Sequence, residues 1–195
     1  MGRWQAGSRS DARPDRELWQ RAAAGDEAAF AELFERHVQA VWNHAYRLTG
    51  SWSLAEDLTS GTFLTAWRKR TELTLTGDSA LPWLYTVAGN LARTEFRRWS
   101  RFQRALRRVP AAVAERDHAD DVAERVDDDE RLRTVLAAVR TLPRAERTAV
   151  EMCLLGGVST TDAAAALGIS PVSVRAQISR ARKRLRGLLP GEDQP

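Results

Sequence analysis

The chain has 195 residues, a formal net charge of +4 and a hydrophobic fraction of 43%, which allows one or two small domains. Its single cysteine, Cys153, excludes a disulfide framework, and no apolar run approaches the ~20 residues that cross a bilayer. The polar, arginine-containing start has no secretory apolar core, so we expect a cytoplasmic protein.

The first 108 residues predict a mobile tail over residues 1–14 and a helical domain over residues 15–108. Apolar residues that recur every three or four positions indicate a long helix that ends near Gly50. These residues are Phe30, Leu33, Phe34, Val38, Val41, Trp42 and Ala45. A capping box of Ser53 and Glu56 predicts the next helix. Its outer side is expected to hold Glu56, Asp57, Thr59 and Ser60.

Residues 70–79 predict a loop, because the helical pattern breaks into Thr-rich sequence with turn-forming Gly77 and Asp78. Ser79 is expected to cap a third helix that has Pro82 in its first turn and that Pro110 stops. This helix is rich in arginine and has Glu95 as its only acid.

Side chains that suit single-stranded nucleic acid gather where this loop meets the third helix. Aromatic rings can stack on unpaired bases, an amide can hydrogen-bond a base edge, and arginines can bind the phosphate backbone. The candidate residues are Trp83, Tyr85, Asn90, Arg93 and Arg97. For either ring alone, a place in the core is the simpler interpretation.

Residues 109–130 contain 9 acidic and 2 basic side chains and few large apolar ones, which predicts a flexible acidic linker. A second helical domain is expected over residues 131–190, followed by a tail at 191–195. Its first helix restarts at Leu132, and Pro143 breaks it. The charge counts are 17 basic and 12 acidic for residues 1–108, against 11 and 5 for residues 131–195. Two basic domains joined by an acidic linker are suited to bind a polyanionic partner at two places.

The end of the second domain predicts a helix-turn-helix. Ser159 and Asp162 form a capping box for a short helix that ends before Gly168, and Ser170 with Pro171 opens the next helix. An apolar stripe is expected to face the core, formed by Val174, Ile178, Ala181, Leu185 and Leu188. The opposite side is cationic and lacks acids, whereas a solvated face normally mixes both signs. We therefore interpret it as a DNA-reading helix.

Six stretches, in order along most of the chain, resemble the extracytoplasmic-function (ECF) sigma factors of bacterial RNA polymerase. Each motif is weak alone, but six in one register are specific, and they cover residues 30–36, 55–59, 62–68, 83–90, 142–143 and 170–185. The resemblance implies that residues 15–108 bind core polymerase and the minus-10 promoter element. Residues 131–190 would read the minus-35 element. The implied partners are core RNA polymerase, promoter DNA and an anti-sigma factor.

The resemblance also assigns individual residues. Polymerase contacts are expected at Glu56, Asp57, Thr59 and Phe63. A specificity loop is expected at residues 77–81, including Gly77, Asp78 and Ser79, and Asn90 would line the pocket for a flipped base. The major-groove readers would be Arg175, Ala176, Gln177, Ser179 and Arg180, to which the cationic face adds Lys183. The chain is thus predicted to be an all-α sigma factor that directs polymerase to promoters and helps to melt them.

Two other functions fit parts of the sequence. A stand-alone helix-turn-helix regulator that binds operator DNA needs neither the acid-bearing helix at residues 56–60 nor the base-capture loop. A nuclease-like enzyme lacks clustered carboxylates for a metal pair. His37 and His44 lie seven residues apart, wider than the usual metal pair, and we expect surface or boundary side chains. No catalytic centre, metal or cofactor is expected.

Overall fold

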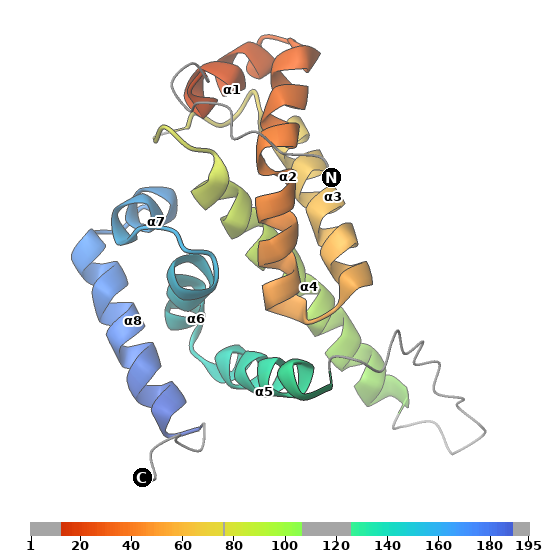
Figure 1. Cartoon of the computed structure of the whole chain (residues 1–195), viewed down its shortest axis with the longest axis vertical. Helices are drawn as coiled ribbons and strands as arrows, with labels where there is room; N and C mark the ends of the chain where they lie inside the picture. Colours follow the sequence, from red (N-terminus) through yellow and green to blue (C-terminus); the bar gives the residue numbers. More distant parts are fainter. Residues whose placement is uncertain (1–12, 76, 107–125, 189–195) are drawn as a thin grey trace, which may run out of the picture.

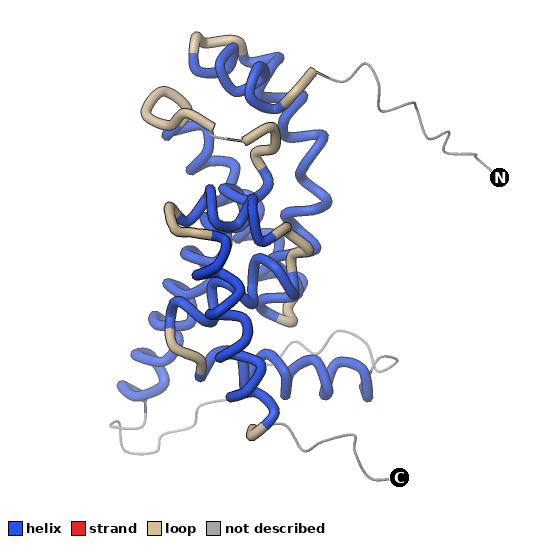
Figure 2. Tube along the Cα trace, turned by 90° about the vertical axis from the view of Figure 1, so that its left-hand side faces the viewer, coloured by secondary structure: helices blue, strands red, loops and turns tan. Residues whose placement is uncertain are grey.

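The computed structural model of the chain is built from helices (Figures 1 and 2). It describes residues 13–75, 77–106 and 126–188, and no strand occurs within these ranges. The all-α class predicted from the sequence is therefore confirmed. The predicted tails lie outside the described residues, apart from Arg13 and Pro14, which precede the first helix. None of the described helices combines the length with the apolar character that a membrane span needs.

Four helices form the N-terminal domain: α1 (Asp15–Ala23), α2 (Glu27–Thr49), α3 (Trp52–Lys69) and α4 (Leu81–Leu106). The central helix α2 contacts the other three (Figure 1). It begins where the Asp26 carboxylate accepts a hydrogen bond from the Ala29 N–H, and it ends at Gly50, whose φ of 67° is left-handed. The predicted end of this helix is confirmed, and its buried residues include Leu33 and Val41.

The start of α3 differs from the prediction. Its cap is Ser51, whose side chain accepts a hydrogen bond from the Leu54 N–H, and Ser53 already lies inside the helix. Both serines are suitable caps by residue type. The left-handed Gly50 turns the chain so sharply that Ser51 is the first residue with the extended backbone that a cap needs.

The C-terminal domain contains α5 (Val126–Thr141), α6 (Arg144–Val150), the π-helical turn η1 (Glu151–Leu155), α7 (Thr160–Leu167) and α8 (Pro171–Arg186). Pro143 separates α5 from α6 as predicted. Ser159 accepts from the Asp162 N–H, and Gly168 ends α7 with a φ of 67°. Ser170 then accepts from the Ser173 N–H to open α8. The predicted helix-turn-helix is confirmed at both helices and at the turn.

Two details of this domain correct the sequence analysis. α5 begins at Val126, six residues before Leu132 and inside the predicted linker. The predicted linker is thus partly helical, and its residues 109–125 lie outside the described ranges. In α8, Val174, Ile178 and Ala181 are buried as expected, but Leu188 is 54% exposed because it follows the helix end.

The two domains pack against each other. Helix α4 contacts α7 and η1, and α2 contacts η1 and α5. Leu155 of η1 adds to an apolar cluster formed by α2, α3 and α4, and the Arg47 Nη1 donates to the Leu155 carbonyl at 2.7 Å. This closed arrangement, defined by the contact of η1 and α7 with α2 and α4, brings the C-terminal domain over part of the predicted minus-10 region.

Candidate nucleic-acid interface

The recognition helix α8 presents a cationic face to solvent. Arg175, Ser179, Arg180 and Lys183 are exposed, whereas Ala176 and Gln177 are half-buried at its margins. The helix contains no acidic residue. Its opposite side packs through Val174 and Ile178 onto α6, η1 and α7. A helix held in this way can enter the major groove of B-DNA with its basic side chains outward.

A buried carboxylate in α6 orients part of this face. Glu146 is only 7% exposed in its side chain, and its oxygens lie 3.5 Å from Arg180 Nε and 3.0 Å from Arg184 Nε. Both arginine side chains remain more than half exposed, at 58% and 57%. Glu146 thus restricts the direction of the two guanidinium groups and leaves their outer donors free for a partner.

The predicted minus-10 loop follows α3 and ends at α4. Asp78 and Ser79 are exposed and Gly77 is half-buried. The Ser79 Oγ accepts a hydrogen bond from the Leu81 N–H at 3.2 Å, which supports the predicted cap of α4. Trp83 is half-buried with its ring edge-on to Trp19 at 5.3 Å.

Tyr85 belongs to the core, as the simpler interpretation of this ring predicts. It is 7% exposed and stacks on His44, with 4.0 Å between the ring centroids and 14° between the planes. Gly156 of the C-terminal domain also lies beside Tyr85, and a Cβ there would lie 2.6 Å from the Met152 carbonyl oxygen and 2.8 Å from the tyrosine ring. A side chain at position 156 would therefore clash both within its own domain and with Tyr85 across the contact between the domains.

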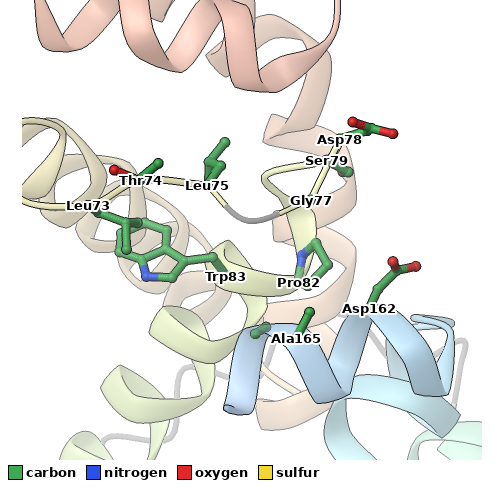
Figure 3. Close-up of a pocket in the computed structure, with 11 residues that line it drawn as sticks. Leu73, Thr74, Leu75, Gly77, Asp78, Ser79, Pro82, Trp83, Asp162 and Ala165 are labelled. Carbon is green, nitrogen blue, oxygen red and sulfur yellow. The ribbon is translucent and has the colours of Figure 1, made fainter. Parts of the chain in front are cut away.

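A cavity of about 320 Å³ lies between the loop and the C-terminal domain (Figure 3). One wall is formed by residues 73–75 and 77–79 with Pro82 and Trp83, and the other by Asp162, Ala165 and Ala166 of α7. Figure 3 shows Asp162 and Ala165 approaching the loop from the helix below it. The first helix of the helix-turn-helix therefore faces the predicted base-capture loop.

Arg93 joins the two domains through an ion pair. Its Nη1 donates to Glu151 Oε2 at 2.9 Å and to Thr148 Oγ1 at 3.2 Å, and its Nη2 donates to Asn90 Oδ1 at 2.7 Å. The side chains of Arg93 and Glu151 are only 13% and 11% exposed. Burial raises the pKa of Glu151, although the Arg93 charge opposes that effect. Two of the predicted minus-10 residues are thus engaged within the protein, while Arg97 stays exposed.

The predicted polymerase-binding face on α3 is only partly exposed. Glu56 and Asp57 point outward, but Thr59 is 5% exposed, which corrects the expectation that it lies on the outer side. Thr59 falls on the buried side because it follows Ala55 by one turn, and its hydroxyl donates to the Ala55 carbonyl at 2.7 Å. Phe63 is also buried and packs edge-on against Phe34 at 4.7 Å. Thr59 and Phe63 therefore lie beneath the face.

The two histidines of α2 are buried, contrary to the expectation of surface or boundary positions. His37 is 5% exposed, with its Nε2 2.6 Å from Asp15 Oδ2. His44 is fully buried against Tyr85, and burial is the main cause that lowers its pKa to about 4. Within the described residues, no group of three or more histidine, cysteine, aspartate or glutamate side chains is placed to hold a metal ion.

Comparisons with known proteins decide the family. The family descriptions "Sigma-70 region 2" and "Sigma-70, region 4" match residues 33–102 and 132–185. The ECF RNA polymerase sigma factor BldN of Streptomyces coelicolor is 32% identical over 94% of this chain and 69% of its own length. The ECF RNA polymerase sigma factor SigL of Mycobacterium tuberculosis is 31% identical over 85% of this chain and 91% of its own.

The chain belongs to the ECF sigma factors. It is therefore a sigma factor that binds RNA polymerase and directs it to specific promoters, a role in transcription initiation that is known as non-enzymatic. A stand-alone regulator is not favoured, because region 2 matches as well as region 4.

Two solved structures have a similar fold. The sigma factor RpoE of Bartonella quintana, solved with the anti-sigma factor NepR, is 25% identical with a TM-score of 0.55 and covers 84% of this chain and 98% of its own. CnrH, solved with the cytosolic domain of CnrY, has a TM-score of 0.61 at 24% identity over 92% of this chain and 99% of its own.

Some residues of this ECF sigma factor form long-range contacts that its sequence pattern does not predict. Asp15 and Trp19 of α1 bind the loop before α4, and Glu151 binds Arg93. Their partners are 65, 54 and 58 residues away. No periodic signal connects positions so far apart.

Proposed function

We propose that the two domains of this sigma factor grip a promoter at separate elements. The C-terminal domain, residues 131–190, reads the minus-35 duplex through α8, with Arg175, Gln177, Ser179 and Arg180 toward base edges and Lys183 toward phosphate. The observation that supports this most directly is the exposed, acid-free face of α8 on a helix-turn-helix.

The N-terminal domain, residues 15–108, captures the opened minus-10 strand at its loop and at the start of α4. Gly77, Asp78 and Ser79 form the tip of the loop, Trp83 lines the adjoining cavity, and Tyr85 is buried in the core against His44. Asn90 binds a base edge, and Arg93 and Arg97 bind phosphates. Asn90 is exposed and is bound to Arg93 within α4, whereas Arg93 is also engaged with Glu151, so the closed arrangement must open before Arg93 binds DNA.

Core polymerase contacts the outer face of α3 at Glu56 and Asp57, and the buried Thr59 and Phe63 support that face from beneath. The anti-sigma complex of the similar RpoE supports an anti-sigma factor as a further partner. The protein acts in the cytoplasm with polymerase, and it contributes promoter recognition without a catalytic centre or cofactor of its own.

Run-off transcription tests the assignment of α8. With bacterial core polymerase and a promoter library, wild-type protein should select a defined pair of elements. Arg180→Ala should lose discrimination at one minus-35 position by about 1–3 kcal/mol, because a bidentate base contact is removed. Lys183→Ala should weaken DNA binding at all promoter sites. It should also reduce the slope of the binding constant against salt concentration by about the amount that one phosphate contact contributes.

Arg16→Ala is the matched control, since it removes an exposed arginine of α1 in the other domain. It should leave minus-35 base discrimination intact. Unchanged selectivity in Arg180→Ala, or an equal loss of selectivity in Arg16→Ala, would contradict the proposed reading face.

A further inference from the structure

Helix α1 binds both ends of the loop that precedes α4. At the first end, the Trp19 Nε1 donates a hydrogen bond to the Leu73 carbonyl at 2.9 Å. At the other, the Asp15 Oδ2 accepts the Ala80 N–H at 2.7 Å. The residues joined by these hydrogen bonds are 54 and 65 positions apart in the sequence, respectively. The contacts therefore hold the loop against a helix that is distant from it along the chain.

The Asp15 carboxylate is a rigid anchor. It is 3% exposed, its Oδ2 lies 2.6 Å from His37 Nε2, and its Oδ1 accepts from Arg36 Nη1 at 2.7 Å. Burial alone would raise the pKa of Asp15, but hydrogen bonds from His37, the Ala80 N–H and Arg36 lower it to about 2. The carboxylate is therefore ionised at neutral pH, and each of its oxygens has a partner.

The position of the second contact is suited to hold α4. Ala80 immediately precedes α4, and its N–H is one of the backbone donors at that end which no helical carbonyl can satisfy. A carboxylate also complements the positive end of the helix dipole. Asp15 thus fixes where α4 begins, and Trp19 packs edge-on against Trp83 in the first turn of the same helix.

The anchored ends contrast with the exposed tip. Leu75 and Ala80 are buried, at 6% and 1% exposure, whereas Asp78 and Ser79 between them are exposed. A loop whose ends are fixed while its tip is open presents the tip in one shape. Such support from a neighbouring element is what a precise recognition site requires.

We propose that Asp15 and Trp19 are positioning residues for minus-10 recognition, which they serve by holding the ends of the loop and the start of α4 against α1. The inference rests on the proposed function of that loop. Neither side chain touches the promoter. Their loss changes which bases are accepted at the minus-10 element and leaves the affinity for core polymerase unchanged.

Asp15→Asn and Trp19→Phe test this inference. Asparagine keeps the shape but loses the charge, and phenylalanine keeps an aromatic ring beside Trp83 but loses the indole N–H. The readout is the ratio of run-off product from a selected promoter to that from its minus-10 single-base variants, at equal polymerase-bound sigma factor. We expect each variant to lower this ratio about fivefold, as the loss of one well-formed hydrogen bond implies.

Two matched controls make the same changes elsewhere in the domain. Asp26→Asn removes a carboxylate that accepts a backbone N–H at the start of α2, and Trp42→Phe changes a tryptophan in the aromatic group with Tyr46 and Trp52. Both should keep the wild-type ratio. Thermal melts establish that each variant is folded at the assay temperature, and Trp19→Phe serves alone if Asp15→Asn is not.

Three outcomes are decisive. Lowered selectivity in the α1 variants with unchanged core affinity supports the positioning role. Unchanged selectivity in both α1 variants, or an equal loss in the two controls, overturns it while the proposed function stands. Failure of the wild-type protein to start transcription on any promoter of the library overturns the proposed function, and with it this inference.

Discussion

At the scale of single residues, His44 shows how burial changes the chemistry of a side chain. It is fully buried on α2, neither ring nitrogen has a hydrogen-bond partner among the described residues, and its ring stacks on Tyr85. Burial lowers its pKa from 6.5 to about 4, and the nearby Arg47 charge adds to the effect. The imidazole is therefore neutral at physiological pH and acts as an aromatic core residue.

The lowered pKa of His44 predicts a dependence of stability on pH. Between pH 6.5 and 4 the unfolded state binds a proton that the folded state does not, so stability falls as the pH falls. His44→Phe removes this linkage. Its free energy of unfolding should decline by roughly 3 kcal/mol less than that of the wild type between pH 7 and pH 4.

Urea unfolding at several pH values measures this difference. Other groups titrate in both proteins and cancel in the comparison, and Asp15, with its pKa lowered to about 2, stays ionised throughout the interval. Parallel pH profiles for His44→Phe and the wild type would show that His44 is protonated in the folded protein.

At the scale of elements, α8 depends on its cap. The Ser170 side chain accepts the Ser173 N–H at 3.1 Å, and Pro171 follows at a position where no N–H is needed. Because α8 is strongly cationic and has no acid in its first turn, no side-chain charge of its own favours its N-terminus. The hydrogen bond from the Ser173 N–H to Ser170 is therefore an important stabilising contact at the N-terminus of α8.

Ser170→Ala should lower the free energy of unfolding by about 1 kcal/mol, since the first turn of α8 loses a backbone hydrogen bond. Ser60→Ala, which removes an exposed hydroxyl inside α3, is the control and should change stability by less than about 0.5 kcal/mol. Chemical unfolding followed by circular dichroism measures both. An equal effect of the two substitutions would mean that the cap contributes nothing.

Elements with local signals were predictable from the sequence, and contacts between elements were not. Ser159, Gly168 and Ser170 act within a few residues of themselves, so their roles follow from sequence spacing. The choice of Ser51 over Ser53 depends on the turn at Gly50, which a residue-type rule does not include. The burial of His37 depends on Asp15, 22 residues earlier on another helix. The same limit applies to the candidate site, where the exposed α8 face was predictable but the Arg93–Glu151 contact was not.

At the scale of the whole molecule, the closed arrangement engages part of the proposed minus-10 site and leaves the face of α8 exposed. The Arg93–Glu151 pair is buried between the domains, Asn90 is bound to Arg93, and α7 forms a wall of the cavity at the loop. Further polar contacts bind the same pair of domains, including the Arg140 Nη2 with the Leu48 and Thr49 carbonyls at 3.4 Å. Under the proposed function, binding of minus-10 DNA by Arg93 competes with the contact between the domains.

Glu151→Gln should shift the protein toward an open arrangement. The substitution leaves the buried Arg93 cation without its counter-charge, a loss that typically costs about 3–5 kcal/mol, and the open state returns Arg93 to water or to phosphate. Affinity for single-stranded minus-10 DNA should rise on the order of tenfold, because the competent fraction of the protein increases. The radius of gyration from small-angle X-ray scattering should rise with it.

Glu95→Gln is the matched control for this prediction, because Glu95 pairs with Arg98 on the same helix α4 at 3.1 Å but in an exposed position, with side chains 42% and 69% exposed. An exposed pair contributes little, so this variant should keep the wild-type radius and change DNA affinity by no more than about twofold. If Glu151→Gln matches Glu95→Gln in both measurements, the ion pair does not hold the domains together. If its radius rises without a gain in DNA affinity, the closed arrangement does not restrict the minus-10 site. A rise in both the radius of gyration and the DNA affinity, confined to Glu151→Gln, would mean that separation of the domains makes Arg93 available to the promoter.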